Sequence, residues 1–417
     1  MSAVVRFIKG LGPGILFASM AIGTSHLVLS TKAGAQYGWV MVIPIVLANL
    51  LKYPFFEFGV RYTNITRQSL VQGYVDLGKG YLWLYTAITF ISTFTILAAL
   101  YIVTAGLLAN LFNLSHLGLG AIALALFIGI SLLLIIGKYK VLERSLKIII
   151  SILFISLLVT TILVFYKGSA PMLPEFTPPT VFNEMGVLFL IGLMGWMPTA
   201  VEASGWVSLW GIEKMEADGT VPPLKKALSE FNLGYVITAV LAIFFMVIGW
   251  KTLYGTGIIL SDKAVPFADQ VVSLFTAHIG QWAYPLIALA AFATMFSTCM
   301  TAHDAIARIG IDVFHKLKLT PRTHARQKEF AIAVLLLAVV NWAVITLLGN
   351  HMGNLVALAT FVSFVFAPLL GWMNLKTVMG PSIPTAHRPN RSMRWLTYIG
   401  IVFLTLFALY YCWLLWV

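Results

Sequence analysis

Two polar interruptions inside long apolar stretches are the parts of this chain best placed to do chemistry. The first follows the apolar run 17–22, and the second follows the run 188–193 and contains Pro198. Proline removes a backbone donor and clashes with the preceding turn, and glycine adds flexibility, so both interruptions favour unwinding. Unwound backbone in apolar surroundings exposes groups that need a polar ligand, an ion or water. We therefore predict a substrate site formed by Gly23, Thr24, Ser25 and His26 together with Met194, Gly195, Met197 and Thr199.

The side-chain chemistry of this site favours a small anion. The first interruption offers hydroxyl groups and one imidazole, and it has no carboxylate that could neutralise a dication. A dication in the middle of a bilayer must regain its lost hydration, and Mn²⁺, Mg²⁺ and Ca²⁺ regain it chiefly from carboxylate oxygens. Backbone N–H groups at the start of a half-helix favour anions instead.

Three side chains keep other chemistries open. Glu202 follows Thr199 by three residues, so it could share that helix face and accept a proton, bind a coupling cation or supply a carboxylate to a metal. His26 and Met197 are candidate metal ligands if the substrate is a metal ion. The plainer alternatives are a Glu202 that partners a polar group on another helix, a histidine bonded to a backbone carbonyl, and a methionine that fills a packing gap.

The elements that must position these residues are membrane-spanning helices. Hydrophobic residues make up 60% of the 417 residues and charged residues only 10%, whereas soluble domains carry about 25% charged residues. Each long apolar stretch can cross a bilayer as a helix, and open strands cannot. We therefore predict an all-α polytopic membrane protein, with one transporter domain over residues 1–417 and eleven transmembrane helices. The predicted spans are Gly12–Ala33, Val40–Tyr62, Leu82–Asn113, Leu117–Ile136, Leu146–Tyr166, Met185–Trp210, Asn232–Trp250, Trp282–Ile306, Ala331–Leu348, Val356–Leu375 and Trp395–Trp416.

The basic residues predict the orientation of these spans. Of the 27 lysines and arginines, 22 fall in loops on one side of the predicted bilayer, and Lys32 and Lys52 lie within spans. The positive-inside rule then places the N-terminus in the cytoplasm and the C-terminus outside, and we expect the membrane to be a bacterial inner (plasma) membrane. The net charge of +12 is explained by topology, so it implies no nucleic-acid partner.

The two interrupted spans occupy corresponding places if the chain contains two repeats. We predict a first repeat over residues 12–166, a second over 185–375, and an extra helix over 395–416. Because each repeat has five spans, the second has the opposite orientation to the first. Paired interrupted spans are the best sequence indication of a secondary transporter's binding site.

Several short motifs along the chain belong to one known pattern. They are Gly12-Pro13-Gly14, Ala33-Gly34-Ala35-Gln36-Tyr37-Gly38, Leu142-Glu143-Arg144, Met197-Pro198, and Ser297-Thr298 with Met300-Thr301. With these motifs the sequence resembles the Nramp family of divalent-metal transporters, within the superfamily that shares the LeuT fold. The resemblance implies a LeuT-like 5+5 inverted repeat whose helices 1 and 6 are broken. It also implies a coupling-ion site near Ser297 and Thr298, where LeuT-like sodium transporters bind Na⁺ against the first broken helix.

The ligands that the family uses for its metal are mostly changed in this sequence. The family's Asp-Pro-Gly-Asn motif aligns with Gly23-Thr24-Ser25-His26, so the carboxylate is lost. Its Met-Pro-His motif aligns with Met197-Pro198-Thr199, so the methionine remains and the histidine is lost. By its motifs, this sequence therefore resembles a divergent member of the Nramp family.

The function that we predict is secondary-active transport by alternating access. The favoured substrate is a small, bicarbonate-like anion coupled to Na⁺ or H⁺. The alternative is an importer of a divalent metal ion (Mn, Fe or Mg) of the Nramp type, coupled to protons. We expect no enzymatic activity and no cofactor, with Na⁺ as a candidate coupling ion, a small inorganic ion and the lipid bilayer as partners, and an oligomeric state that the sequence leaves open.

Overall fold

The computed structural model describes residues 13–137, 151, 154–155, 157–318, 327–348 and 352–414. These residues form helices and connecting turns, and there is no strand among them. Eight helical stretches of this part of the chain are long and apolar enough to cross a membrane. The all-α class is confirmed, whereas the count of eleven spans stays a prediction, because two predicted spans are divided and one is only partly described.

The helices follow one another along the chain with short connections. They are α2 (Pro13–Ala21), η1 (Ser25–Ser30), α3 (Thr31–Tyr37), η2 (Gly38–Met41), α4 (Val42–Thr66), α5 (Leu70–Leu77), α6 (Lys79–Leu111), η3 (Ser115–Leu117), α7 (Leu119–Ile136), α9 (Glu184–Gly195), α10 (Ala203–Asp218), α11 (Leu224–Leu253), α12 (Ala264–Ile279), η4 (Gln281–Ala283), α13 (Tyr284–Leu317), α14 (Gln327–Leu348), α15 (Met352–Met379), η5 (Thr385–His387) and α16 (Arg391–Leu414).

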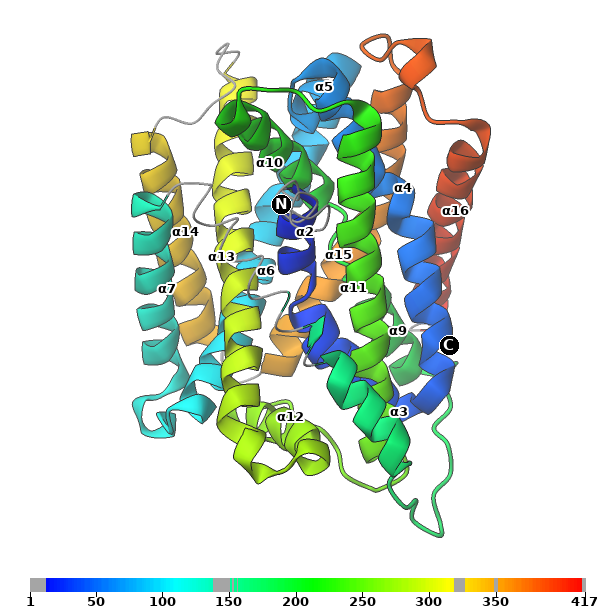
Figure 1. Cartoon of the computed structure of the whole chain (residues 1–417). Coiled ribbons are helices and arrows are strands. Elements are labelled where there is room, and N and C mark those ends of the chain that lie inside the picture. The colour runs from blue at the N-terminus through cyan, green and yellow to red at the C-terminus, as the bar shows by residue number, and fades with distance from the viewer. Residues whose placement is uncertain are drawn as a thin grey trace, which may run out of the picture.

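Most predicted spans coincide with one helix, and the exceptions have simple causes. The fifth span is described as a helix only over Leu157–Lys167, and its beginning lies outside the described residues, as do Gly12 and the motif Leu142-Glu143-Arg144. The sequence analysis did not predict α5 and α12, which are too short to span a bilayer. These two helices lie at opposite ends of the bundle (Figure 1), and we refer to its two ends as the α5 end and the α12 end.

The two interrupted spans run in opposite directions through the middle of the bundle. In Figure 1, α2 and α10 lie toward the α5 end, and α3 and α9 lie toward the α12 end. The first span therefore runs away from the α5 end, and the sixth runs toward it. This is the antiparallel pairing that an inverted repeat requires.

Both helix breaks are confirmed, but each is displaced from its predicted position. The first break is confined to Ile22 and Gly23, because the backbone N–H groups of His26 and Leu27 both donate to Gly23 O and start the π-helix η1 directly afterwards. The second break runs from Trp196 to Glu202, so Met194 and Gly195 are the last residues of α9. A π-helix has a wider turn than an α-helix, so the chain continues after the first break with its backbone hydrogen bonds intact. The hydropathy of the residues cannot distinguish a π-helix from unwound chain.

Both halves of the first span pack closely on α11. A Cβ atom at Gly34 in α3 would lie 1.9 Å from Met246 O of α11. At the other end of the span, a Cβ atom at Gly234 in α11 would lie 2.1 Å from Gly14 O of α2. Small residues let helix backbones approach in a membrane, where close packing replaces the hydrophobic effect between helices.

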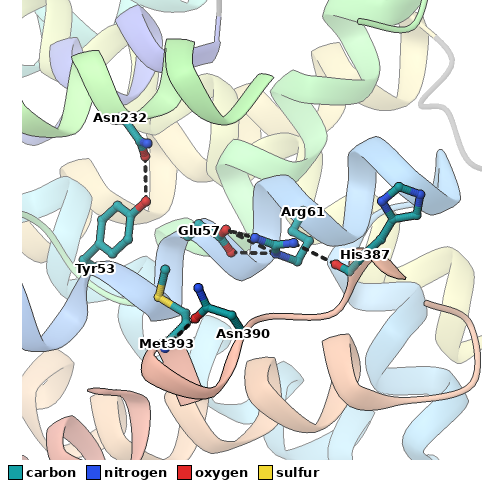
Figure 2. Close-up of polar contacts among 7 residues, drawn as sticks. All are labelled: Tyr53, Glu57, Arg61, Asn232, His387, Asn390 and Met393. Carbon is teal, nitrogen blue, oxygen red and sulfur yellow. Dashed lines mark hydrogen bonds and ion pairs between the residues drawn. The ribbon is translucent and has the colours of Figure 1, made fainter. Parts of the chain in front are cut away.

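Polar contacts fix α16 to the bundle at the α5 end. Figure 2 shows the Arg61 side chain between the Glu57 carboxylate and the backbone carbonyl of His387, which accepts a hydrogen bond of 2.7 Å. The Asn390 side chain accepts a 2.9 Å bond from Met393 N and caps the start of α16. The Glu57–Arg61 pair thus joins α4 to the segment before α16.

Candidate functional site

A small cavity lies between the two breaks. Its volume is about 20 Å³, which is enough for one water molecule or one small ion. The first span, the second break, α6, α10 and α13 all contribute to its wall, and the lining residues are Met20, Ala21, Thr24, Ser25, Ile96, Leu100, Trp196, Thr199, Ala200, Trp206 and Ala302. The π-helix η1, which follows the first break, also contacts the second break directly, since Ser25 Oγ lies 3.5 Å from Pro198 O.

The wall of this cavity carries hydroxyl groups and one sulfur atom. Thr199 donates its hydroxyl to the sulfur of Met20 at 3.2 Å. The hydroxyl of Thr24 is buried without a hydrogen-bond partner among the described residues, so it is free to bind a ligand. Met197 is fully buried, and the residues that line the cavity include Met20 rather than Met197.

His26 is held by two hydrogen bonds within the protein. Its Nε2 donates to Thr238 O of α11 at 2.9 Å, since a carbonyl can only accept. In the neutral ring Nδ1 is then an acceptor, and the Ser25 hydroxyl lies 2.8 Å from it. Neither ring nitrogen is free to bind a substrate in this conformation, which matches the plainer alternative of a histidine bonded to a backbone carbonyl.

The first break is pinned to α13 by Thr298. Its hydroxyl lies 2.9 Å from Ser19 O and 3.2 Å from Ile22 O, both of which it can use as acceptors. A second contact joins Ser19 Oγ to Ser297 Oγ at 3.2 Å. A Cβ atom at Gly23 would lie only 2.6 Å from Cγ2 of Thr298, so this side chain also explains why glycine stands at the break. Of the three predicted coupling-ion residues, Ser297 and Thr298 therefore lie together against the first break, whereas Glu202 belongs to the second.

The second break surrounds a buried ammonium group. Lys52 of α4 is fully buried, and its Nζ donates to Met194 O at 3.0 Å, to Gly195 O at 2.9 Å and to Thr199 O at 2.9 Å. The predicted site residues Met194 and Gly195 thus face Lys52 through their backbone carbonyls. Thr199 takes part in both environments, because its hydroxyl contacts Met20 and its carbonyl accepts from Lys52.

Glu202 is the acidic side chain of the second break. It is 1% exposed, and its Oε1 accepts a 2.6 Å bond from Ser92 of α6 and a 3.3 Å bond from Ser363 of α15. Its Oε2 is buried without a hydrogen-bond partner among the described residues. Glu202 and Lys52 interact electrostatically, so their opposite charges compensate each other within one break.

A wider pocket opens toward the α5 end. It has a volume of about 340 Å³ and lies between α2, α4, α10 and α11, with Lys214, Asp218 and Lys226 among its polar residues. Gly14 of α2 and Phe231 of α11 also line it, so this pocket reaches the outer end of the first half-helix. The pocket thus lies on the side of the first half-helix that faces the α5 end, and it shares no lining residue with the small cavity.

Comparison with known families decides the lineage. The profile described as natural resistance-associated macrophage protein-like (Nramp) matches residues 14–414. The chain is a member of the Nramp family. An uncharacterized protein of Pasteurella multocida (strain Pm70) is 32% identical to this Nramp protein over 404 residues, which cover 96% of this chain and 90% of that protein. The chain is thus a multi-pass membrane transporter and not an enzyme.

Solved structures share the fold of this Nramp protein. A manganese transporter of Eremococcus coleocola has a TM-score of 0.69 at 15% identity, with 98% of this chain and 87% of that chain covered. MhsT, solved with L-phenylalanine, has a TM-score of 0.64 at 16% identity, with 95% and 98% covered. Mhp1, a nucleobase-cation-symport-1 family transporter, has a TM-score of 0.62 at 13% identity, with 97% and 92% covered. These likenesses confirm the LeuT-like fold.

Sequence reasoning missed several residues that shape the site. Lys52 gave a usable signal, because a charged residue inside an apolar span is rare and marks a functional or structural site. Ser92 and Met20 gave none, because serine and methionine are ordinary residues of membrane-spanning helices, where they serve as polar contacts and as packing fillers. Of the eight predicted substrate-site residues, Thr24, Ser25 and Thr199 line the cavity, whereas Gly23, His26, Met194, Gly195 and Met197 do not.

Proposed function

We propose that this Nramp protein imports a divalent metal ion of the Mn²⁺ class by alternating access. Family membership over almost the whole described chain carries the proposal, and the shared fold with a manganese transporter supports it. The antiparallel broken helices and the cavity between them supply the arrangement that alternating access needs. The small-anion function favoured by the sequence analysis becomes the second candidate.

The cavity between the breaks is the proposed place of metal binding. The sulfur of Met20 and the hydroxyl groups of Thr24 and Ser25 can each donate a lone pair. Met197, the ligand type retained from the family pattern, is fully buried in the second break and would reach the ion only after a rearrangement. Glu202 does not line this cavity, but it is the carboxylate of the second break, and its Oε2 has no hydrogen-bond partner among the described residues.

One specific observation keeps the anion function as a candidate. The first break contains no carboxylate, and the second break surrounds the buried ammonium of Lys52, whose charge interacts with that of Glu202. A small anion would be attracted by Lys52, whereas a dication would be repelled by it. The two functions therefore differ in how they respond to an added negative charge at the cavity.

Uptake into proteoliposomes tests the two functions. Mn²⁺ and bicarbonate uptake are measured under imposed H⁺ and Na⁺ gradients, for the parent and for Thr24→Asp and Thr24→Asn. These variants have the same shape and differ in charge, and Thr24 is preferred to Gly23 because a side chain at Gly23 would collide with Thr298. We expect Mn²⁺ uptake by the parent and faster uptake by Thr24→Asp than by Thr24→Asn. Saturable bicarbonate uptake that is lost only in Thr24→Asp, with no Mn²⁺ uptake, would establish the anion function instead. The gradient that drives uptake identifies the coupling ion.

A further inference from the structure

The environment of Lys52 is that of a cation bound in a carbonyl cage. An ammonium group has three donors and no acceptor, and here each donor has a backbone carbonyl within 3.0 Å. None of these three partners is a carboxylate. The side chain is fully buried, so the three carbonyls replace water as the solvation shell of the charge.

The three carbonyls also lie at a place in the fold that suits a bound cation. Met194 and Gly195 are the last residues of α9, where the helix dipole places partial negative charge on the terminal carbonyls. Met194 O also accepts a 3.4 Å bond from Met197 N. Thr199 lies in the unwound segment that follows. In transporters with broken helices, half-helix C-terminal ends and unwound carbonyls are the groups that coordinate a coupling cation.

Lys32, a second lysine inside a predicted span, has a carboxylate as its partner. Its Nζ lies 2.5 Å from Asp262 Oδ1, and the Asp262 side chain is 78% exposed. Lys52 instead directs its donors at neutral dipoles, while its compensating charge, Glu202, bonds to Ser92 and Ser363. The two lysines thus serve as a matched pair for experiment.

We propose that the break between α9 and α10 is a monovalent-cation site, which this chain fills permanently with the ammonium of Lys52. The lysine is a tethered ion that neutralises Glu202 and completes the carbonyl cage. The sixth span then needs no mobile cation at this place. The inference concerns the charge of the break and holds whether the substrate is a metal ion or an anion.

Truncation of the lysine should convert the cage into a binding site for a free ion. The purified protein and its variants Lys52→Ala, Lys52→Met and Lys32→Ala are heated in detergent in the chlorides of ammonium, potassium, sodium or choline at equal ionic strength. The folded fraction is then measured by size-exclusion chromatography. Ammonium is the closest chemical match to the lost group, and choline is too large for the cage.

We expect ammonium to raise the ratio of folded to unfolded Lys52→Ala about tenfold over choline, if the ion is present at roughly ten times its Kd. Potassium or sodium should have a smaller effect. Lys52→Met should be destabilised and should gain nothing from ammonium, because its side chain fills the cage without charge. The parent and Lys32→Ala should behave alike in all four salts.

Three results would overturn the proposal. The first is a Lys52→Ala protein whose stability does not depend on the cation, including one that fails to fold in every salt. The second is an equal response to ammonium in Lys52→Met or Lys32→Ala, which would show a general salt effect. The third is a Lys52→Met protein as stable as the parent in choline, since the break would then need no cation. Because no transport is measured, these results stand apart from the test of the transported substrate.

Discussion

The substitution Gly23→Ala tests whether the first break is shaped by contact with α13. The backbone of Gly23 does not have a positive φ, so an alanine is allowed by its backbone conformation. What forbids it is Thr298, whose Cγ2 would lie 2.6 Å from the added Cβ. Carbon atoms prefer a separation of about 3.5–4.0 Å, so one of the two side chains must move by about 1 Å.

The cost of this clash follows from the contacts of Thr298. Overpacking in a close-packed interior costs about 1–3 kcal/mol. Displacing the Thr298 hydroxyl from Ser19 O and Ile22 O removes one donated bond, which is worth about 1 kcal/mol. The reduced freedom of the unfolded chain returns about 0.4–1 kcal/mol. We therefore expect Gly23→Ala to lower the free energy of unfolding by about 2 kcal/mol.

A second substitution should cancel most of this loss. Thr298→Ser removes Cγ2, keeps the hydroxyl, and should alone cost about 1 kcal/mol for one buried methyl group. In the double variant the closest contact is gone, and the added Cβ meets only Oγ1 at 3.0 Å and Cβ at 3.2 Å. Its free energy of unfolding should therefore approach that of Thr298→Ser, with a coupling of up to about 2 kcal/mol. Thr298→Val is the control, because it keeps the clashing methyl group and should not rescue.

Reversible unfolding in mixed micelles titrated with a denaturing detergent gives the four free energies of this cycle. The expected sign is a double variant more stable than the sum of the single losses. Additive losses, with a coupling below about 0.5 kcal/mol, would refute the contact as the reason for glycine at position 23. Rescue by Thr298→Val would refute it equally.

Three further outcomes can be checked. Ser92→Ala removes the 2.6 Å bond to Glu202 and should lower the free energy of unfolding by about 1.5–3 kcal/mol in the same detergent titration; a loss below 0.5 kcal/mol would contradict the assigned bond. Asp262→Asn breaks an ion pair whose acidic partner is exposed, so it should cost under about 1 kcal/mol and its effect should shrink when the salt concentration is raised to 0.5 M. A cysteine at Thr220, at the α5 end, should react with an impermeant reagent only from the cytoplasmic side of oriented vesicles, and labelling from outside would reverse the predicted topology.

The sequence was sufficient to predict the architecture because the signals involved are local. Apolar stretches predict helices. Gly23 and Pro198 predict the two breaks within a few residues of the positions that the breaks have in the structure. The exact ends could not be predicted. His26 was expected in unwound chain, yet it belongs to a π-helix whose backbone bonds begin at Gly23.

The contacts of the site could not be read from the sequence because they join distant segments. Lys52 meets carbonyls more than 140 residues away, and backbone carbonyls carry no residue-specific signal. The carboxylate missing from the first break was read as a sign of an anion, but Glu202 places one in the second break beside Lys52. The first break therefore lacks a carboxylate and the second has one, and a comparison of one motif at a time cannot show that the two breaks lie together.

The close packing of α11 on the first span limits how this break can bend. Gly34 holds the half toward the α12 end against α11, and Gly14 with Gly234 holds the other half against the same unbroken helix. Because both halves of the first span are held on the same continuous helix, the break between them cannot bend while both contacts persist. The first span can therefore bend at the break only if one of these glycine contacts opens, and otherwise the span and α11 must move together as one rigid body. A bulky residue at Gly14 would separate only α2 from α11, and one at Gly34 would separate only α3, with the other half left in contact.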